Sequence, residues 1–194
     1  MATKVERKKR NKKKKYNYID ASMTKRFISY IIDWYVGALC TAIPIAITSQ
    51  KLTNTMLNQN IVEFEQPYGI ISGVIAVLFA IFYFVIVPTY IYPGQTVGKR
   101  ICKIKIVQNN NEPVTIKNIL LRQLLGIIVI EGVLVTASAI WHEVITIITQ
   151  INFVTPLMYA GFVVTAVSIL LYLFKGEHRA LHDYIGNTKV VSCN

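Results

Sequence analysis

The sequence has 194 residues, of which 53% are apolar and only 16% are charged, and its formal net charge at pH 7 is +11. Soluble globular domains usually have about a quarter of their residues charged, so this composition excludes an ordinary water-soluble protein. The apolar residues also occur in long blocks, which are typical of integral membrane proteins.

Four nearly uncharged stretches are long enough to cross a bilayer, whose hydrocarbon core of about 30 Å takes about 20 helical residues. They cover residues 27–47, 69–91, 119–140 and 153–174. Each is expected to be helical, because lipid offers no partner for a free backbone N–H or C=O group. Residues 141–152 are too short to span and are expected to form an amphipathic stretch on the outer surface. The predicted fold class is therefore an all-α membrane protein, a four-helix transmembrane bundle.

The first apolar stretch follows a basic segment, as a signal peptide would. Its apolar run is too long for a signal peptide, contains Asp33, and is followed by no small-residue cleavage site. We therefore expect it to remain in the protein as the first span.

The positive charges predict the orientation of the spans. Of the 21 Lys and Arg residues, 11 lie in residues 1–26, five in residues 92–118 and three after residue 174. Lys51 is the single basic residue in the two other connections. Loops rich in Lys and Arg stay on the cytosolic side. The sequence thus predicts a multi-pass protein of the cell membrane with both termini and the central loop in the cytosol.

Residues 1–20 form a polybasic tail that is expected to be disordered, because its like charges repel one another. The tail serves as an orientation signal, and it can also bind anionic lipid headgroups, since each basic residue near such a surface contributes about 1 kcal/mol. The residues assigned to lipid binding are Lys12, Lys13, Lys14 and Lys15. A nucleic-acid partner is not expected, because that would require a folded basic surface or interleaved aromatic residues.

The central cytosolic loop, residues 92–118, has the pattern of a small β element. In residues 102–107 (CKIKIV) apolar side chains alternate with lysines, as in a half-buried strand. The following NNNEP segment is typical of a turn, so residues 114–116 are expected to return as the second strand of a hairpin. The C-terminal cytosolic segment, residues 175–194, contains another strand-like run at 188–191, which we expect to pair with the hairpin.

Two segments resemble known site motifs but do not satisfy them. Residues 93–100 (PGQTVGKR) have one residue too few between the glycines for a phosphate-binding loop, and are expected to form a tight turn and a short interfacial helix. His178 and His182 are four residues apart, but no nearby Glu completes a zinc-hydrolase pattern. The sequence therefore predicts neither an enzyme nor a metal or cofactor site.

Ionisable residues inside the spans are functional candidates, because each costs about 2.5–3.5 kcal/mol at the centre of a helix. Asp33 lies about two turns into the first span, and Arg122 lies at a similar depth in the third. We expect these two residues to pair, with Arg26 at the membrane edge. Glu131 lies near the middle of the bilayer with no basic residue at its depth, so it needs a partner of its own, a water-filled cavity or a proton. The pair is either a structural lock or part of a transport path.

Three blocks of the sequence carry a pattern that extends over most of the chain. They are residues 25–36 (KRFISYIIDWYV), 94–107 (GQTVGKRICKIKIV) and 179–191 (RALHDYIGNTKVV). Taken in this order, the blocks resemble the RDD family, and the resemblance covers residues 21–191. It implies that the family's named Arg and its two Asp residues fall on Arg26, Asp33 and Asp183.

The resemblance implies a bacterial membrane protein and leaves two functions open, because some members are linked to cation/proton antiport and others to accessory roles. In the transport interpretation, Arg26, Asp33 and Glu131 form a path for a cation or proton, and Asp183 closes its cytosolic mouth. Four helices enclose little volume, so this function would require a homo-oligomer. In the alternative, the charges stabilise the fold of a scaffold, regulator or immunity-type partner of another membrane protein.

Overall fold

The computed structural model describes residues 18–132 and 135–193. The first long helix, α2, covers Met23–Thr53 and contains the predicted span 27–47. It begins where Ser22 Oγ accepts a hydrogen bond from the backbone N–H of Lys25, and it ends where Asn54 adopts a left-handed conformation with φ of 57°. A helix of 31 residues is about 46 Å long, so α2 is longer than the hydrocarbon core of about 30 Å.

The second long helix lies where a helix was predicted over residues 69–91. It consists of α3 (Tyr68–Ile81), which follows the short turn η1 (Ile61–Glu63), and of η2 (Phe82–Ile91), a continuation with wider π-type turns. This helix packs closely against α2, since a Cβ added at Gly37 would lie 2.6 Å from Cζ of Phe84. The glycine therefore allows the two helices to approach one another.

The third predicted span is broken, and the expectation of one continuous helix over 119–140 is wrong. The helix formed by α5 (Ile116–Ile119) and η3 (Leu120–Glu131) stops at Gly132, and α6 (Thr136–Thr149) continues at an angle of 63°. Most of the stretch at 141–152, expected to lie separately on the outer surface, belongs to α6.

At this break the backbone carbonyls that lose their helical N–H partners accept hydrogen bonds from side chains instead. The carbonyl of Ile128 accepts hydrogen bonds from Ser138 Oγ at 2.8 Å and from Trp141 Nε1 at 3.0 Å. The carbonyl of Glu131 accepts one from Thr165 Oγ1 at 2.6 Å. Broken helices are tolerated inside membranes when their freed backbone groups are satisfied in this way.

The last long helix, α7, covers Val154–Phe174 and agrees with the helix predicted over residues 153–174. Within residues 18–132 and 135–193, three helices are long and apolar enough to cross a membrane: α2, α3 with η2, and α7. The bent pair formed by α5–η3 and α6 makes a fourth if it is counted as one span. The structure thus supports three to four spans rather than a regular four-helix bundle.

The strands predicted in the central loop and at the C-terminus pair with one another. β1 (Ile104–Gln108) and β2 (Thr188–Ser192) are antiparallel, with Ile106 opposite Val190. Both of these side chains are buried, together with Val85 of η2. The sheet is therefore fastened to the C-terminal part of the second long helix by an apolar contact.

The hairpin expected within the loop does not form, because residues 114–116 are not a strand. Val107 forms an isolated bridge with Pro113, and Thr115 instead caps helix α5, where its side chain accepts a hydrogen bond from the N–H of Asn118. The short helix expected after the turn is present as α4 (Val97–Ile101), and a second one, α8 (Leu181–Ile185), precedes β2.

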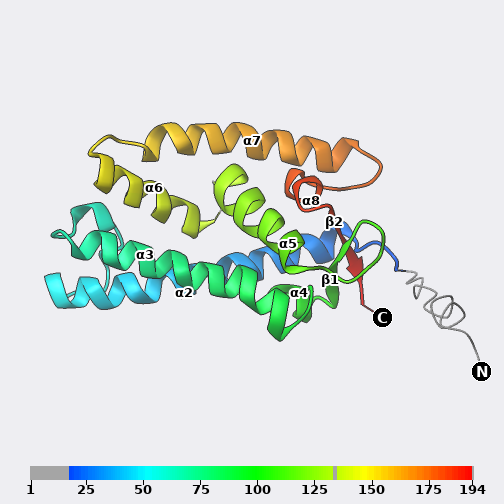
Figure 1. Cartoon of the computed structure of the whole chain (residues 1–194), viewed down its shortest axis with the longest axis horizontal. Coiled ribbons are helices and arrows are strands. Elements are labelled where there is room, and N and C mark those ends of the chain that lie inside the picture. The colour runs from blue at the N-terminus through cyan, green and yellow to red at the C-terminus, as the bar shows by residue number, and fades with distance from the viewer. Residues whose placement is uncertain (1–17, 133–134, 194) are drawn as a thin grey trace, which may run out of the picture.

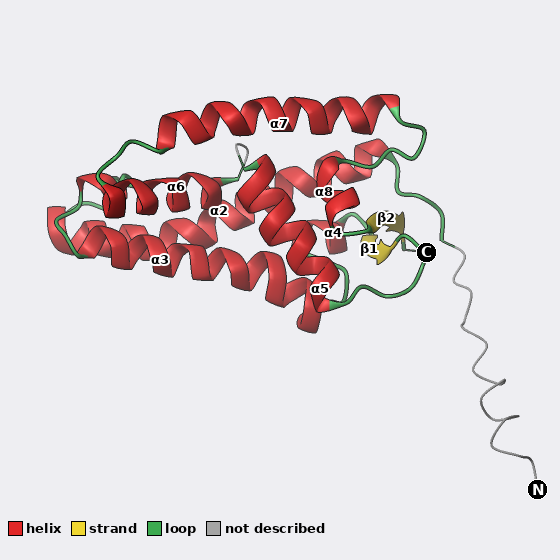
Figure 2. Ribbon diagram, turned by 45° about the horizontal axis from the view of Figure 1, so that its top comes forward, coloured by secondary structure: helices red, strands yellow, loops and turns green. Residues whose placement is uncertain are grey.

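The long helices lie side by side in an elongated molecule. Figure 1 shows α7 along one side, α2 and α3 along the other, and α5 and α6 between them. The sheet, α4 and α8 gather at one end, next to the start of α2, as both views show (Figures 1 and 2). The segments that carry most of the positive charges in the described part of the chain therefore meet at that end.

Candidate functional site

Asp33 of α2 is almost completely buried, with an exposed fraction of 3%, and four donors surround its carboxylate. Oδ1 accepts hydrogen bonds from the Tyr83 hydroxyl at 2.7 Å and from the backbone N–H of Gly98 at 2.9 Å. Oδ2 accepts from the Thr96 hydroxyl at 2.6 Å and from Lys99 Nζ at 2.8 Å. The negative charge is thus neutralised by Lys99 and fully hydrogen-bonded.

The predicted pair between Asp33 and Arg122 is therefore wrong. Apart from Tyr83 of η2, the partners of Asp33 come from the loop segment whose spacing failed the test for a phosphate-binding loop. Gly98 is essential to this contact, because a Cβ there would lie 2.3 Å from the carbonyl oxygen of Ser29 and 2.8 Å from Oδ1 of Asp33. Backbone N–H groups at the start of a helix attract an anion, and here that anion is a side chain of the same protein.

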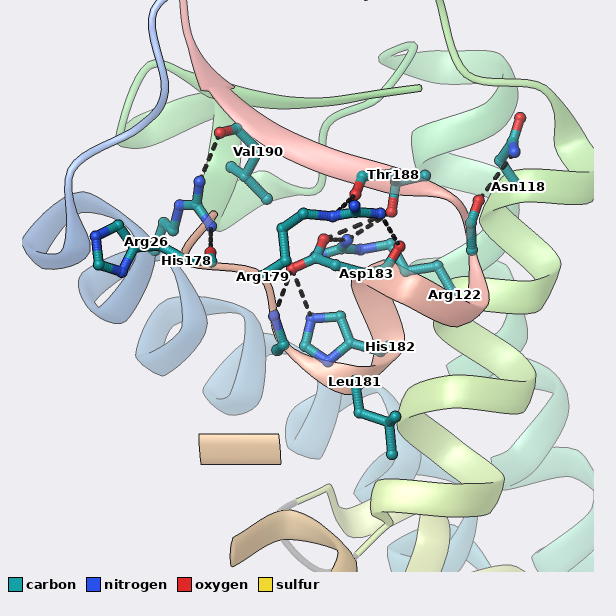
Figure 3. A network of polar contacts seen from close by, with 12 residues as sticks. Arg26, Asn118, Arg122, His178, Arg179, Leu181, His182, Asp183, Thr188 and Val190 are labelled. Carbon is teal, nitrogen blue, oxygen red and sulfur yellow. Dashed lines mark hydrogen bonds and ion pairs between the residues drawn. The ribbon is translucent and has the colours of Figure 1, made fainter. Parts of the chain in front are cut away.

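Arg122 pairs instead with Asp183, and both side chains are almost inaccessible (Figure 3). Arg122 Nη1 donates to Asp183 Oδ1 and also to Thr188 Oγ1 at 2.8 Å. Asp183 Oδ2 accepts from the backbone N–H of Ala180 at 3.2 Å. Arg179 completes the network by donating to the backbone carbonyls of Thr188 and Asp183. This network connects η3 to α8 and β2.

Two opposing effects determine the pKa of Asp183 in this network: burial and the nearby positive charges. Burial of the carboxyl alone would raise its pKa, but the guanidinium of Arg122 and the neighbouring His182 hold the pKa below its usual value of 3.8. The carboxylate is therefore ionised at neutral pH and stabilises the folded state through its pairing.

Glu131, which the sequence placed alone, also has a partner. Its Oε2 lies 2.8 Å from Nδ1 of His182, and its Oε1 accepts hydrogen bonds from the backbone N–H of His182 and from the Ser168 hydroxyl, each at 2.8 Å. The expectation failed because His182 belongs to a segment assigned to the cytosol. Helix α8 instead folds back under the spans and brings the imidazole to the end of η3.

Arg26 joins the start of α2 to the C-terminal segment, as Figure 3 shows. Its Nη1 donates to the carbonyl of His178 at 2.7 Å, its Nη2 to that of Val190 at 2.9 Å, and its Nε to that of Ala21 at 3.1 Å. The guanidinium also lies 5.7 Å from the ring centre of Tyr172. Within the described residues, Arg26 has no carboxylate partner.

A cavity of about 610 Å³ lies between α2, η3, α7 and α8. The predicted site residues on its wall are Arg26, Arg122, Glu131 and Asp183, together with His182 and Lys99, which the sequence analysis did not assign to a site. Asp33 is separate from the cavity, behind Lys99. In the part of the chain that the structure describes, no group of three or more metal-ligating side chains occurs. The predicted lipid-binding residues Lys12, Lys13, Lys14 and Lys15 lie outside the described residues.

The helices and their charged, paired side chains define a multi-pass membrane protein. The RDD family profile matches residues 20–187, and the chain belongs to this family. The resemblance drawn from the three sequence blocks is thereby confirmed. No curated protein and no solved structure matches the chain.

The first prediction concerns the Asp33–Lys99 pair. Replacing Asp33 with Asn leaves the Lys99 ammonium without a counter-charge, and we expect a loss of about 3–5 kcal/mol of stability. The measurement is the thermal unfolding midpoint in detergent. Adding Lys99→Gln to Asp33→Asn should recover part of the loss, whereas Lys117→Gln at an exposed position should change nothing. A midpoint unchanged by Asp33→Asn would contradict the structural role.

The second prediction concerns pH. Because the pKa of Asp183 is lowered in the folded state, its stabilising effect is complete above the usual value of 3.8 and is lost as the pH falls through the folded-state pKa. The difference in unfolding midpoint between wild type and Asp183→Asn should therefore be constant at neutral pH and shrink below about pH 4. The exposed Asp20→Asn is the matched control, and a difference that persists undiminished to about pH 3 would refute the assignment.

Proposed function

We propose that this RDD family protein is a transporter rather than an enzyme, and that it moves protons in exchange for a monovalent cation across the cell membrane. The observation that carries the proposal is the Glu131–His182 pair on the wall of the cavity. A carboxylate and an imidazole in contact can exchange a proton, and ionisable groups at membrane depth commonly belong to proton relays. Exchange with a cation is what the family resemblance implies.

The three carboxylates differ in their suitability for transport. Asp33 is enclosed by four donors and is separate from the cavity, and Asp183 is buried against Arg122. Glu131 lies on the cavity wall, and the side chains of Glu131 and His182 are 13% and 18% exposed. The proton site is therefore assigned to Glu131. Asp33 instead holds α4 against α2 through its contacts with Gly98 and Lys99. A homo-oligomer would complete the path, since four helices enclose little volume.

We propose further that the end of the molecule with the sheet, α4 and α8 faces the cytosol, together with both termini. The basic segments around Lys99, Lys105 and Lys189 lie at this end, and segments rich in Lys and Arg stay on the cytosolic side of a membrane. Anionic headgroups of the inner leaflet are then the expected partners of the polybasic tail.

An accessory protein is the second candidate, and one observation favours it. Asp33 and Asp183 have all the partners that a structural ion pair needs, so neither charge requires a transport role. In this case the protein is a scaffold, regulator or immunity-type partner of another membrane protein. A flux measurement on the purified protein distinguishes the accessory protein from the transporter.

The third prediction is a flux measurement in proteoliposomes under an imposed pH gradient. Wild type should exchange protons for Na⁺ or K⁺, and Glu131→Gln and His182→Gln should reduce the flux to background, because each removes one member of the proton-exchanging pair. Glu177→Gln is the matched control, since the Glu177 side chain is 64% exposed. The folding of each variant is checked by its elution volume in size-exclusion chromatography and by its thermal unfolding midpoint.

Two outcomes would change the assignment. If wild type moves neither protons nor either cation, the transporter proposal is abandoned in favour of an accessory protein. If wild type transports and Glu131→Gln does so equally well, the proton site lies elsewhere in the chain.

The fourth prediction concerns orientation. In a background without Cys40, Cys102 and Cys193, a cysteine placed at Glu65 should react with a membrane-impermeant thiol reagent in intact cells. A cysteine at the exposed position Lys117 should react after the cells are opened and not before. Labelling of the Lys117 position from outside would refute the proposed topology.

A further inference from the structure

The cavity between α2, η3, α7 and α8 has features that a proton path alone does not require. Its volume of about 610 Å³ falls within the usual range for sites that bind organic ligands, about 300–1,000 Å³. Most of the surface that lines the cavity is apolar, with contributions from Phe27 of α2 and Ile127 of η3. Phe27 and Ile169 are 64% and 50% exposed, so the rim of the cavity is itself apolar. A rim of this kind suits contact with lipid hydrocarbon better than contact with water.

Each charged side chain on the wall except one is paired with a side chain of opposite charge or with an imidazole. Glu131 is paired with His182, Asp183 with Arg122, and Lys99 with Asp33. Arg26 is the remaining charge of the wall, and within residues 18–132 and 135–193 it contacts no carboxylate. A guanidinium that contacts no carboxylate favours an anionic ligand at its own position on the wall.

The guanidinium of Arg26 has donors left for such a ligand. An arginine side chain carries five N–H groups, one on Nε and two on each terminal nitrogen. Arg26 uses one from each nitrogen to bind the backbone carbonyls of Ala21, His178 and Val190. One N–H therefore remains on each terminal nitrogen, and two such donors bind a phosphate group well. The three carbonyl contacts also hold the guanidinium in place before a ligand arrives.

We propose that this cavity binds an anionic phospholipid of the inner leaflet, with one acyl chain against the apolar wall and the phosphate on Arg26. Arg26 lies in the first turn of α2, at the end of the molecule proposed to face the cytosol, and therefore at the level of the headgroups. Basic pockets between membrane helices on this side are known to accept acidic headgroups. Nine Lys and Arg residues in positions 1–15 would enrich such lipids next to α2.

The test is lipid retention by the full chain, purified in a neutral detergent and examined by native mass spectrometry. The protein is incubated with phosphatidylglycerol or with phosphatidylcholine of the same acyl chains. Wild type should retain one phosphatidylglycerol in preference to phosphatidylcholine, and Arg26→Gln should weaken this retention by about tenfold, because a charge-assisted contact is lost. Arg100→Gln is the control of equal charge, since Arg100 stacks on Tyr92 away from the cavity wall. The basic tail is present in every variant, so its own lipid binding cancels.

A second pair of variants tests the acyl-chain position without altering a charge. Ile169→Trp should fill the rim of the cavity and reduce retention, whereas Leu170→Trp, the equally exposed neighbour that does not line the cavity, should have no effect. This pair also decides the matter if Arg26→Gln fails to fold. Equal retention of the two lipids, an equal loss in Arg100→Gln, or full retention in Ile169→Trp would each overturn the proposal. Retention is measured without a gradient, so the result is independent of whether the protein transports ions.

Discussion

A charge inside the membrane must be neutralised within the protein, and the arrangement of this chain follows from that constraint. Each carboxylate singled out in the sequence receives donors from a segment far away along the chain: Asp33 from the central loop, Asp183 from η3, and Glu131 from α8. An unpaired charge at the centre of a membrane-spanning helix would cost about 2.5–3.5 kcal/mol on insertion scales. The loop and the C-terminal segment are therefore ordered because they carry the counter-charges.

The same constraint explains how the third span can be broken. A kink of 63° frees backbone carbonyls at the end of η3, and the side chains of Ser138, Trp141 and Thr165 donate to them. The break also leaves the Glu131 carboxylate at the end of a helix rather than along its side. From that position it reaches both α7 and α8, which a residue within a straight helix would not do.

Sequence reasoning succeeded where one local pattern decides the structure. Long apolar runs predicted the long helices, and the alternation in residues 102–107 and the strand-like run at 188–191 predicted two strands that do pair. It failed where distant segments meet. The partners of Asp33 and Arg122 were chosen by depth along straight helices, with the loops assumed to stay in the cytosol. The loop motif around Gly98 could have predicted the partner of Asp33. A glycine, a hydroxyl and a lysine at the start of a helix can bind a carboxylate of the same protein as well as a phosphate.

The paired charges fasten the elements to one another through contacts that differ in their accessibility. Asp33 fastens α4 to α2, and Arg122 fastens α8 to η3, both through buried contacts that are costly to break. The Glu131–His182 contact is more accessible and joins α8 to the break in the third span. Neutralising Glu131 or His182 would weaken this contact while the Arg122–Asp183 pair still holds α8. Because Glu131 and His182 both lie on the wall of the cavity, the contact between them is the part of the wall that a change in their charge would alter.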